Sequence, residues 1–159
     1  MGEQNLIQAP VCVLAVDPGL SGAVCRLGGG HFDVRRDFKT LKDITIAIRD
    51  LAGDVTQGVI EFVHSRPGQG VRSMFSFGLA TGVAKSALWS WLQAPVEEVA
   101  PQAWQGFFRG LLRVPRATEF DARAVAAKIL PSSVPYLSRV KDHNSADAIL
   151  MAAWKLLAS

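Results

Sequence analysis

The chain has 159 residues, of which 49% are hydrophobic and 19% are charged, so its composition excludes general disorder and suffices for a full core. The formal net charge of +3 permits a nucleic-acid partner without requiring one. No apolar run approaches the roughly 18 residues of a membrane span, so we expect no membrane partner.

The first predicted elements are three strands that form an antiparallel meander. An unbroken apolar run over residues 11–16 is typical of a strand buried on both faces of a sheet. Strands at 23–27 and 31–38 follow, joined by a turn of three glycines. Cys12 and Cys25 fall in the first two strands and lack C-x-x-C spacing, so we expect buried, reduced thiols in a cytosolic protein.

Helices and strands alternate after the meander. Apolar residues recur at helical spacing from Leu41 to Leu51, and Gly53 ends that predicted helix. The later predicted elements are, in order, a strand at 59–63, a long helix at 71–92, a strand at 95–99, a short helix that opens at Pro101, a helix at 118–130 capped by Thr118, and a closing helix at 144–157. This order predicts an α/β fold in one domain of residues 1–159. The antiparallel meander and the parallel strands form a mixed five-stranded sheet with helices on both faces.

Three acids occur where a carboxylate is costly. Asp17 ends the first buried strand, Glu61 lies in the apolar segment VIEFV, and Asp147 lies in the first turn of a closing helix that is apolar nearly all round. A buried carboxylate must be paired, hydrogen-bonded or bound to a cation. Each acid also has an ordinary explanation: Asp17 as a turn residue, Glu61 paired with an arginine, and Asp147 in a capping box with Asn144.

Three such carboxylates at one end of a sheet would bind divalent metal ions. Hard oxygen ligands suit Mg²⁺ or Mn²⁺. Two ions ~3.5–4 Å apart stabilise the attacking and leaving oxygens of phosphodiester hydrolysis. The chain has neither a G-x-S-x-G nor an H-E-x-x-H motif, so the sequence favours hydrolysis that needs no serine or cysteine nucleophile.

Four segments in chain order resemble the motifs of the RuvC-type Holliday junction resolvases, specifically the short phage-type and organelle-type branch. They are VDPGLSGAV (16–24), VIEFVHSRPGQGVRSMFSFGLATG (59–82), VAPQAWQGFF (99–108) and KDHNSADA (141–148). The third segment has Gln105 where the family usually has lysine. The resemblance covers most of the chain.

The resemblance implies an RNase H-like fold, a homodimer, and Mg²⁺-dependent nicking of four-way DNA junctions, with Mn²⁺ as a substitute and no nucleotide cofactor. It also implies the cytoplasm of a bacterial cell or of a phage-infected host. Carried over residue by residue, Asp17, Glu61 and Asp147 match the family's first, second and last metal ligands.

The fourth ligand differs from the family pattern. Family members place an acid or a histidine three residues before the last aspartate, where this chain has Asn144. Because a carboxylate is the better Mg²⁺ ligand, we favour Asp142 as the fourth ligand, in the loop ahead of the helix. His143 is then a proton shuttle or the alternative ligand.

Basic and glycine-rich segments supply candidate DNA contacts, which would bind phosphates with little sequence preference. The basic candidates are Arg66, Arg72, Arg109, Arg113, Arg116 and Lys141. The resemblance adds Gln69 and Phe75, because their family counterparts suggest that this region approaches the junction centre. Solvated surface is the alternative for the cations, and core packing is the alternative for Phe75, which could otherwise unstack bases. The Gly78/Gly82 face of the long helix could pack against a second copy or against the chain's own sheet.

The sequence therefore predicts a structure-specific endonuclease that resolves Holliday junctions. Alternatives are a debranching nuclease of broader specificity, a junction-binding protein with impaired catalysis, and a fragment of an actin-like or sugar-kinase-like ATPase. The last needs a second nucleotide-binding lobe, for which the chain is too short.

Overall fold

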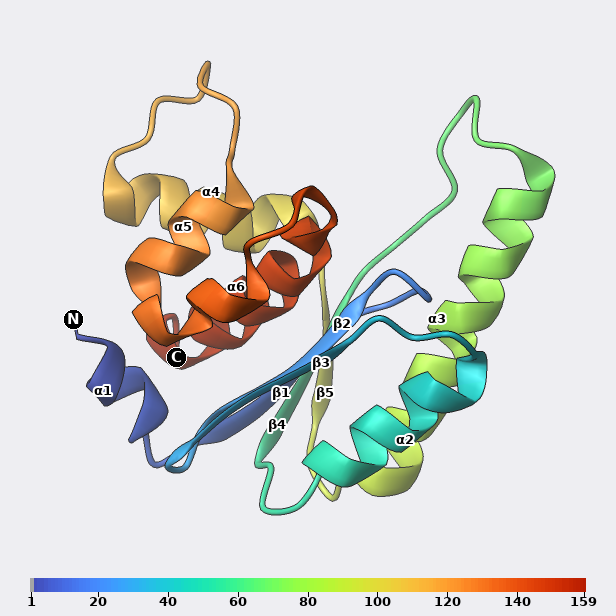
Figure 1. Cartoon of the computed structure of the whole chain (residues 1–159), viewed down its shortest axis with the longest axis horizontal. Coiled ribbons are helices and arrows are strands. Elements are labelled where there is room, and N and C mark those ends of the chain that lie inside the picture. The colour runs from blue at the N-terminus through green and yellow to red at the C-terminus, as the bar shows by residue number, and fades with distance from the viewer. Residues whose placement is uncertain (1) are drawn as a thin grey trace.

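The computed structural model describes residues 2–159 and contains one mixed five-stranded sheet in the order β3-β2-β1-β4-β5 (Figure 1). The strands are β1 (Cys12–Asp17), β2 (Ala23–Gly28), β3 (His31–Arg36), β4 (Gln57–Glu61) and β5 (Val96–Val99). Strand β2 runs antiparallel to both β1 and β3, whereas β4 is parallel to β1 and β5 is parallel to β4. The predicted meander followed by parallel strands is confirmed.

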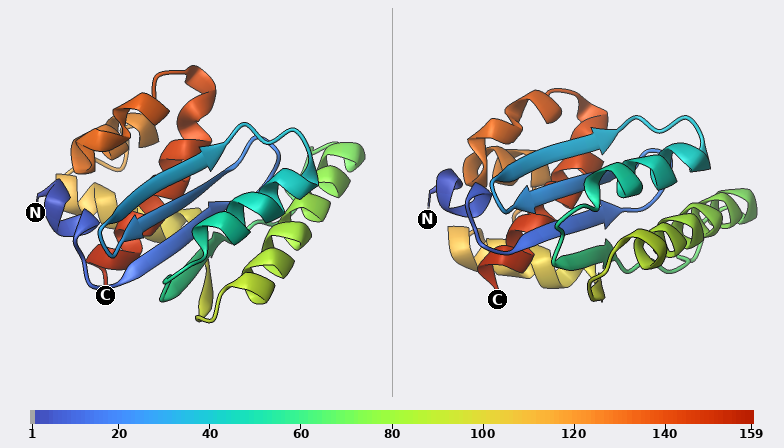
Figure 2. Two further views of the ribbon diagram at one scale, coloured as in Figure 1. Left: turned by 60° about the horizontal axis from the view of Figure 1, so that its bottom comes forward. Right: turned by 90° about the horizontal axis from the view of Figure 1, so that it is seen from below.

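Helices cover both faces of this sheet (Figure 2). They are α1 (Glu3–Ile7), α2 (Leu41–Leu51), α3 (Val71–Trp91), α4 (Pro101–Leu112), α5 (Ala122–Ile129) and α6 (His143–Leu157), with 3-10 turns η1 (Pro131–Tyr136) and η2 (Val140–Asp142). Helices α2 and α3 pack on one face, and α1, α4, α5 and α6 pack on the other. Within residues 2–159, no helix has the length and apolarity needed to cross a membrane.

Strand β1 lies at the centre of two cores. Val13 and Ala15 point into the core shared with α6, whereas Leu14 and Val16 point into the core shared with α2 and α3. Alternate side chains of a strand point to opposite faces, so a strand covered on both sides must be apolar throughout. This explains the uninterrupted apolar run, and the same burial explains why residues 148–153 of α6 are buried on every side.

One predicted helix start and one suggested helix cap are wrong. Helix α5 begins at Ala122 rather than near Thr118, and its N-cap is Asp121, whose side chain accepts from the Ala124 N–H at 3.1 Å. Thr118 instead closes a turn onto the Pro115 carbonyl. Helix α6 begins at His143 with Asp142 at its N-cap position, so Asn144 does not cap it. The short helix α1 was not predicted.

The long helix α3 is less buried than its composition indicates. Only Ala80, Ala84, Ala87 and Leu88 are buried, so no residue of α3 before Ala80 is buried. The first turns of α3 extend beyond the sheet (Figure 1). Val71, Phe75 and Leu79 are exposed there, and Phe75 is 74% exposed. Core packing therefore does not explain Phe75.

The turn after β1 depends on Gly22. A Cβ atom added there would lie 1.9 Å from the Asp17 carbonyl oxygen, and the backbone of the turn cannot yield at low cost. The absence of a side chain at this position therefore lets the β1–β2 turn close tightly over the end of β1.

We predict that Gly22→Ala lowers the free energy of unfolding by about 1–3 kcal/mol through overpacking, measured by denaturant unfolding. The control is Gly106→Ala in α4, where a Cβ meets no atom within 4 Å. Alanine should stabilise that helix by about 0.5–1 kcal/mol. A Gly22→Ala protein as stable as the wild type would contradict this account of the turn.

Candidate active site

The carboxyl ends of β1 and β4 place two acids side by side. In the parallel pairing Val16 lies opposite Ile60, so Asp17 and Glu61, the last residues of their strands, meet at the same edge of the sheet. Asp17 is only 6% exposed. Helix α6 crosses this edge and adds Asp147 from its second turn.

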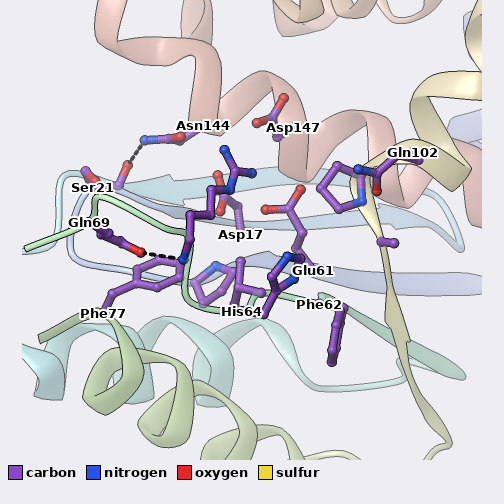
Figure 3. A pocket seen from close by; sticks show the side chains of 15 residues that line it. Asp17, Ser21, Glu61, Phe62, His64, Gln69, Phe77, Gln102, Asn144 and Asp147 are labelled. Carbon is purple, nitrogen blue, oxygen red and sulfur yellow. Dashed lines mark hydrogen bonds between the residues drawn. The ribbon is translucent and has the colours of Figure 1, made fainter. Parts of the chain in front are cut away.

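These three acids line one cavity of about 300 Å³ (Figure 3). The β1–β2 turn, the loop after β4, the first turn of α4 and the start of α6 complete its walls. The remaining labelled lining residues in the figure are Ser21, Phe62, His64, Gln69, Phe77, Gln102 and Asn144. The sequence-based expectation that three remote carboxylates share one site therefore has a structural counterpart in this cavity.

The pKa values of all three carboxyls are raised. Burial is the main cause for Asp17, and the charges of Glu61 and Asp147 raise its pKa further. Burial and the charge of Glu61 raise the pKa of Asp147 to about 7. Burial also raises the pKa of Glu61. Like charges held together in a poorly solvated site oppose ionisation, and a bound cation would relieve that opposition.

Two neighbours act in the opposite direction on Glu61. The indole of Trp104 and the positive charge of Arg66 both lower its pKa, although burial prevails. Trp104 is fully buried, and its Nε1 has no hydrogen-bond partner among residues 2–159. A small movement of Glu61 would provide this buried N–H with an acceptor, which a buried donor requires.

The donor set fits a hard divalent cation, since all three side chains are carboxylates. Within residues 2–159, however, no group of three or more His, Cys, Asp or Glu side chains could hold a metal ion as they stand. Asp147 also lines a neighbouring cavity with His143 and Gln105. A shared cation therefore requires these side chains, above all Asp147, to turn toward the common cavity.

Asn144 anchors the start of α6 to the turn after β1. Its Nδ2 donates to the Ser21 carbonyl oxygen at 2.7 Å, across 123 residues of sequence. Figure 3 shows this bond at the edge of the cavity. The residue that stands at the family's fourth ligand position thus holds α6, and with it Asp147, against the strand end that carries Asp17.

Asp142 lies outside this cavity. It is 1% exposed and accepts from Arg36 Nη1 at 2.7 Å and from Arg139 Nη2 at 2.7 Å. Burial alone would raise the pKa of Asp142, but the bonds from Arg139 and the charge of Arg36 lower it to about 2. A carboxylate already held by two guanidinium groups is a poor metal ligand, so this placement does not support the fourth-ligand role that the sequence favoured.

His143 also lies outside the cavity of the three acids. It is exposed and lines the neighbouring cavity on the other side of Asp147. Its Nδ1 lies 3.3 Å from the Val140 carbonyl oxygen. The structure therefore gives His143 no contact with the space between Asp17 and Glu61, where a proton shuttle would act.

Two of the predicted DNA contacts border the acidic cavity. Arg66 and Gln69 line it, and the Gln69 side chain accepts from the Arg66 N–H at 3.3 Å. Lys141 lines a different cavity together with Asp142. Ser21 lines both of these cavities, so Lys141 lies near the same β1–β2 turn as the acidic cavity.

The other five predicted DNA contacts lie outside the cavity. Arg72 and Phe75 are exposed in the first turns of α3, and Arg113 and Arg116 are exposed at and after the end of α4. Arg109 is used within the fold, because its Nη1 donates to the carbonyl oxygens of Pro115 and Thr118.

Several lining residues were not predicted, notably Ser21, His64 and Gln102. Gln102 follows Pro101 in the first turn of α4, directly after β5. Because parallel strands end at the same edge of a sheet, the start of α4 belongs beside Asp17 and Glu61. Strand order could therefore have indicated Gln102, whereas nothing in the local sequence marks His64.

We predict that the metal-free protein becomes less stable as the pH rises toward neutrality. An unfolded aspartate has a pKa of about 3.9. The folded state, with Asp147 at about 7, binds more protons between about pH 4 and pH 7. The free energy of unfolding should fall in that range, by up to about 1.4 kcal/mol per pH unit for one carboxyl.

Unfolding in EDTA between pH 5 and 8 tests this, with Asp147→Asn as the comparison. The free energy of unfolding of the variant should fall less steeply with pH, because a neutral amide does not titrate. If the free energy of unfolding fell equally steeply with pH in the two proteins, the raised pKa of Asp147 would be contradicted.

No protein-family model and no curated protein matches this chain. Solved structures do match its fold. RuvC from Thermus thermophilus in complex with a Holliday junction substrate has 14% identity and a TM-score of 0.63, over 93% of this chain and 94% of that chain. A second Thermus thermophilus RuvC structure has 14% identity and a TM-score of 0.59, over 93% of this chain and 96% of that chain.

The yeast mitochondrial Holliday junction resolvase Ydc2 is also similar, with 11% identity and a TM-score of 0.55 over 97% of this chain and 83% of that chain. The resemblance seen in the motifs thus extends to the arrangement of strands and helices. The chain has the RNase H-like fold of the RuvC-type Holliday junction resolvases.

Proposed function

We propose that this chain is a metal-dependent, structure-specific endonuclease that nicks four-way DNA junctions by phosphodiester hydrolysis. The observation that carries the proposal is the gathering of Asp17, Glu61 and Asp147, from β1, β4 and α6, around one cavity. The fold supports it, because one similar structure is a RuvC in complex with a Holliday junction substrate.

In this proposal the three carboxylates hold Mg²⁺, or Mn²⁺ as a substitute. Bound ions would supply the Lewis acid that activates water and stabilises the leaving oxygen. The chain's own residues orient this site. Asn144 fixes the start of α6 through the Ser21 carbonyl, and Arg66 brings a positive charge to the cavity wall, where it would contact a DNA phosphate.

We assign Asp142 a positioning role rather than a ligand role. Its ion pair with Arg36 joins the end of β3 to the turn η2 that leads into α6, and its ion pair with Arg139 holds that turn locally. The hydrogen bonds of a buried charged group contribute about 1.5–3 kcal/mol each. This network therefore helps to hold the first turns of α6, where Asp147 lies, against the sheet.

We predict that Glu61→Gln lowers Mg²⁺-dependent cleavage of a four-way junction by at least about 10³-fold, because the amide neither carries the charge nor replaces the carboxylate as an Mg²⁺ ligand. Junction binding in EDTA should persist. Cleavage assays on a four-way junction, a flap and a linear duplex would also show how narrow the specificity is. Wild-type rates in Glu61→Gln would contradict the proposed site.

Asp142→Asn is the matched control, since it makes the same acid-to-amide change outside the cavity. At low temperature and saturating DNA it should keep cleavage within about tenfold of the wild type, and it should unfold at lower denaturant concentration. Complete loss of Mg²⁺-dependent cleavage in a folded Asp142→Asn protein would restore the ligand role.

We also propose that the enzyme is a homodimer that pairs through one face of α3. Exposed apolar side chains share that face at helical spacing: Val71, Phe75, Leu79 and Trp89. Gly78 and Gly82 lie on the same face, and a Cβ at either would meet no atom within 4 Å. An exposed apolar face with small residues at its centre suits close packing against a second copy.

We predict that Leu79→Glu converts the dimer to a monomer, measured by light scattering after size-exclusion chromatography at micromolar concentration. Leu111→Glu is the control, because Leu111 is similarly exposed, at 52% against 49%, but lies on α4. A monomeric wild type, or equal effects of the two changes, would contradict this interface.

A further inference from the structure

A second cavity, of about 460 Å³, lies beside the acidic one. Its charged lining residues are the cations Arg36, Lys39, Arg139 and Lys141 and the acids Asp37 and Asp142. Ser21 lines both cavities, so the β1–β2 turn forms the wall between them. A ligand that lies across this turn would contact both spaces.

The charges in this second cavity do not balance. Four cations face two carboxylates, which leaves two positive charges in excess. Lys39 is exposed and forms no ion pair within residues 2–159. Lys141 makes only a 3.6 Å contact with Asp37, and its side chain is 67% exposed. An exposed pair of this kind contributes little, so both ammonium groups are available to an anion.

The two guanidinium groups are held rigidly. Arg36 bonds Asp142 and also donates to the Tyr136 carbonyl oxygen at 2.7 Å, with its guanidinium 5.5 Å from the centre of the Tyr136 ring. Arg139 Nη2 lies 3.0 Å from each carboxylate oxygen of Asp37. The cavity is therefore built on the buried carboxylate of Asp142, with two guanidinium groups preorganised around it.

We propose that this second cavity binds a backbone phosphate of the DNA strand that enters the active site, an inference that rests on the function proposed above. A phosphodiester strand carries one charge at each phosphate, so one phosphate can occupy the acidic cavity with metal while a neighbour along the strand lies among the cations. An acidic peptide is a poorer fit, because its carboxylates would lie beside Asp17 and Glu61 without a cation of their own. The site would fix the register of the strand without reading its sequence.

The test removes one exposed ammonium at a time and leaves the guanidinium network intact. We expect Lys39→Ala and Lys141→Ala each to weaken junction binding in EDTA by roughly five- to tenfold at 0.1 M salt. Each change should also make the slope of log affinity against log salt shallower by about 1. Lys128→Ala on α5 is the matched control, and it should leave both quantities unchanged. Lys128 is exposed and lines a cavity with Leu6 and Leu157, near the chain ends and away from the site.

The outcomes separate this inference from the proposed function. If the wild type binds the junction but both lysine variants keep its affinity and slope, the phosphate site is refuted and the nuclease proposal stands. If the wild type does not bind branched DNA at any salt concentration, the proposed function itself fails. If inorganic phosphate stabilises the wild type but not the variants, while their junction slopes stay unchanged, the cavity takes free phosphate and the inference is wrong.

Discussion

Electrostatic repulsion among three carboxylates in a poorly solvated cavity is the constraint on which the rest of the site depends. Burial and mutual repulsion raise the pKa values of Asp17 and Asp147, and burial raises that of Glu61. Hydrophobic residues packed in this position would make the folded protein more stable than unpaired buried carboxylates do. We therefore expect the three acids to serve a function other than stability. The divalent cation of the proposed function would turn this repulsion into attraction.

The sheet supplies the positions, and the surrounding contacts hold them. Parallel β1 and β4 bring Asp17 and Glu61 to one edge, and α6 brings Asp147 over them. The start of α6 is held by the Asn144 bond to Ser21 on one side and by the Asp142 ion pairs on the other. The site thus depends on contacts between segments that are more than 100 residues apart in sequence.

The sequence predicted best those elements whose pattern of apolar residues follows directly from burial. The apolar run before Asp17 indicated a strand end, whereas the sequence placed Glu61 inside a strand over residues 59–63. Strand β4 instead ends at Glu61, and its parallel pairing with β1 brings Asp17 and Glu61 together. Asp142 could not be placed in this way, because its partner Arg36 lies on a distant strand and no local spacing reports that pair. The start of α5 was misplaced because Thr118 and Asp121 are both good capping residues, and tertiary contacts decide between them.

The most direct test of the shared cation site is carboxyl ¹³C NMR of the protein during a Mg²⁺ titration near pH 7. The account predicts that the side-chain resonances of Asp17, Glu61 and Asp147 shift together with a common dissociation constant, and that the pKa of Asp147 falls well below about 7 when Mg²⁺ is bound. Resonances that do not move, or a shift confined to one of the three carboxyls, would contradict it.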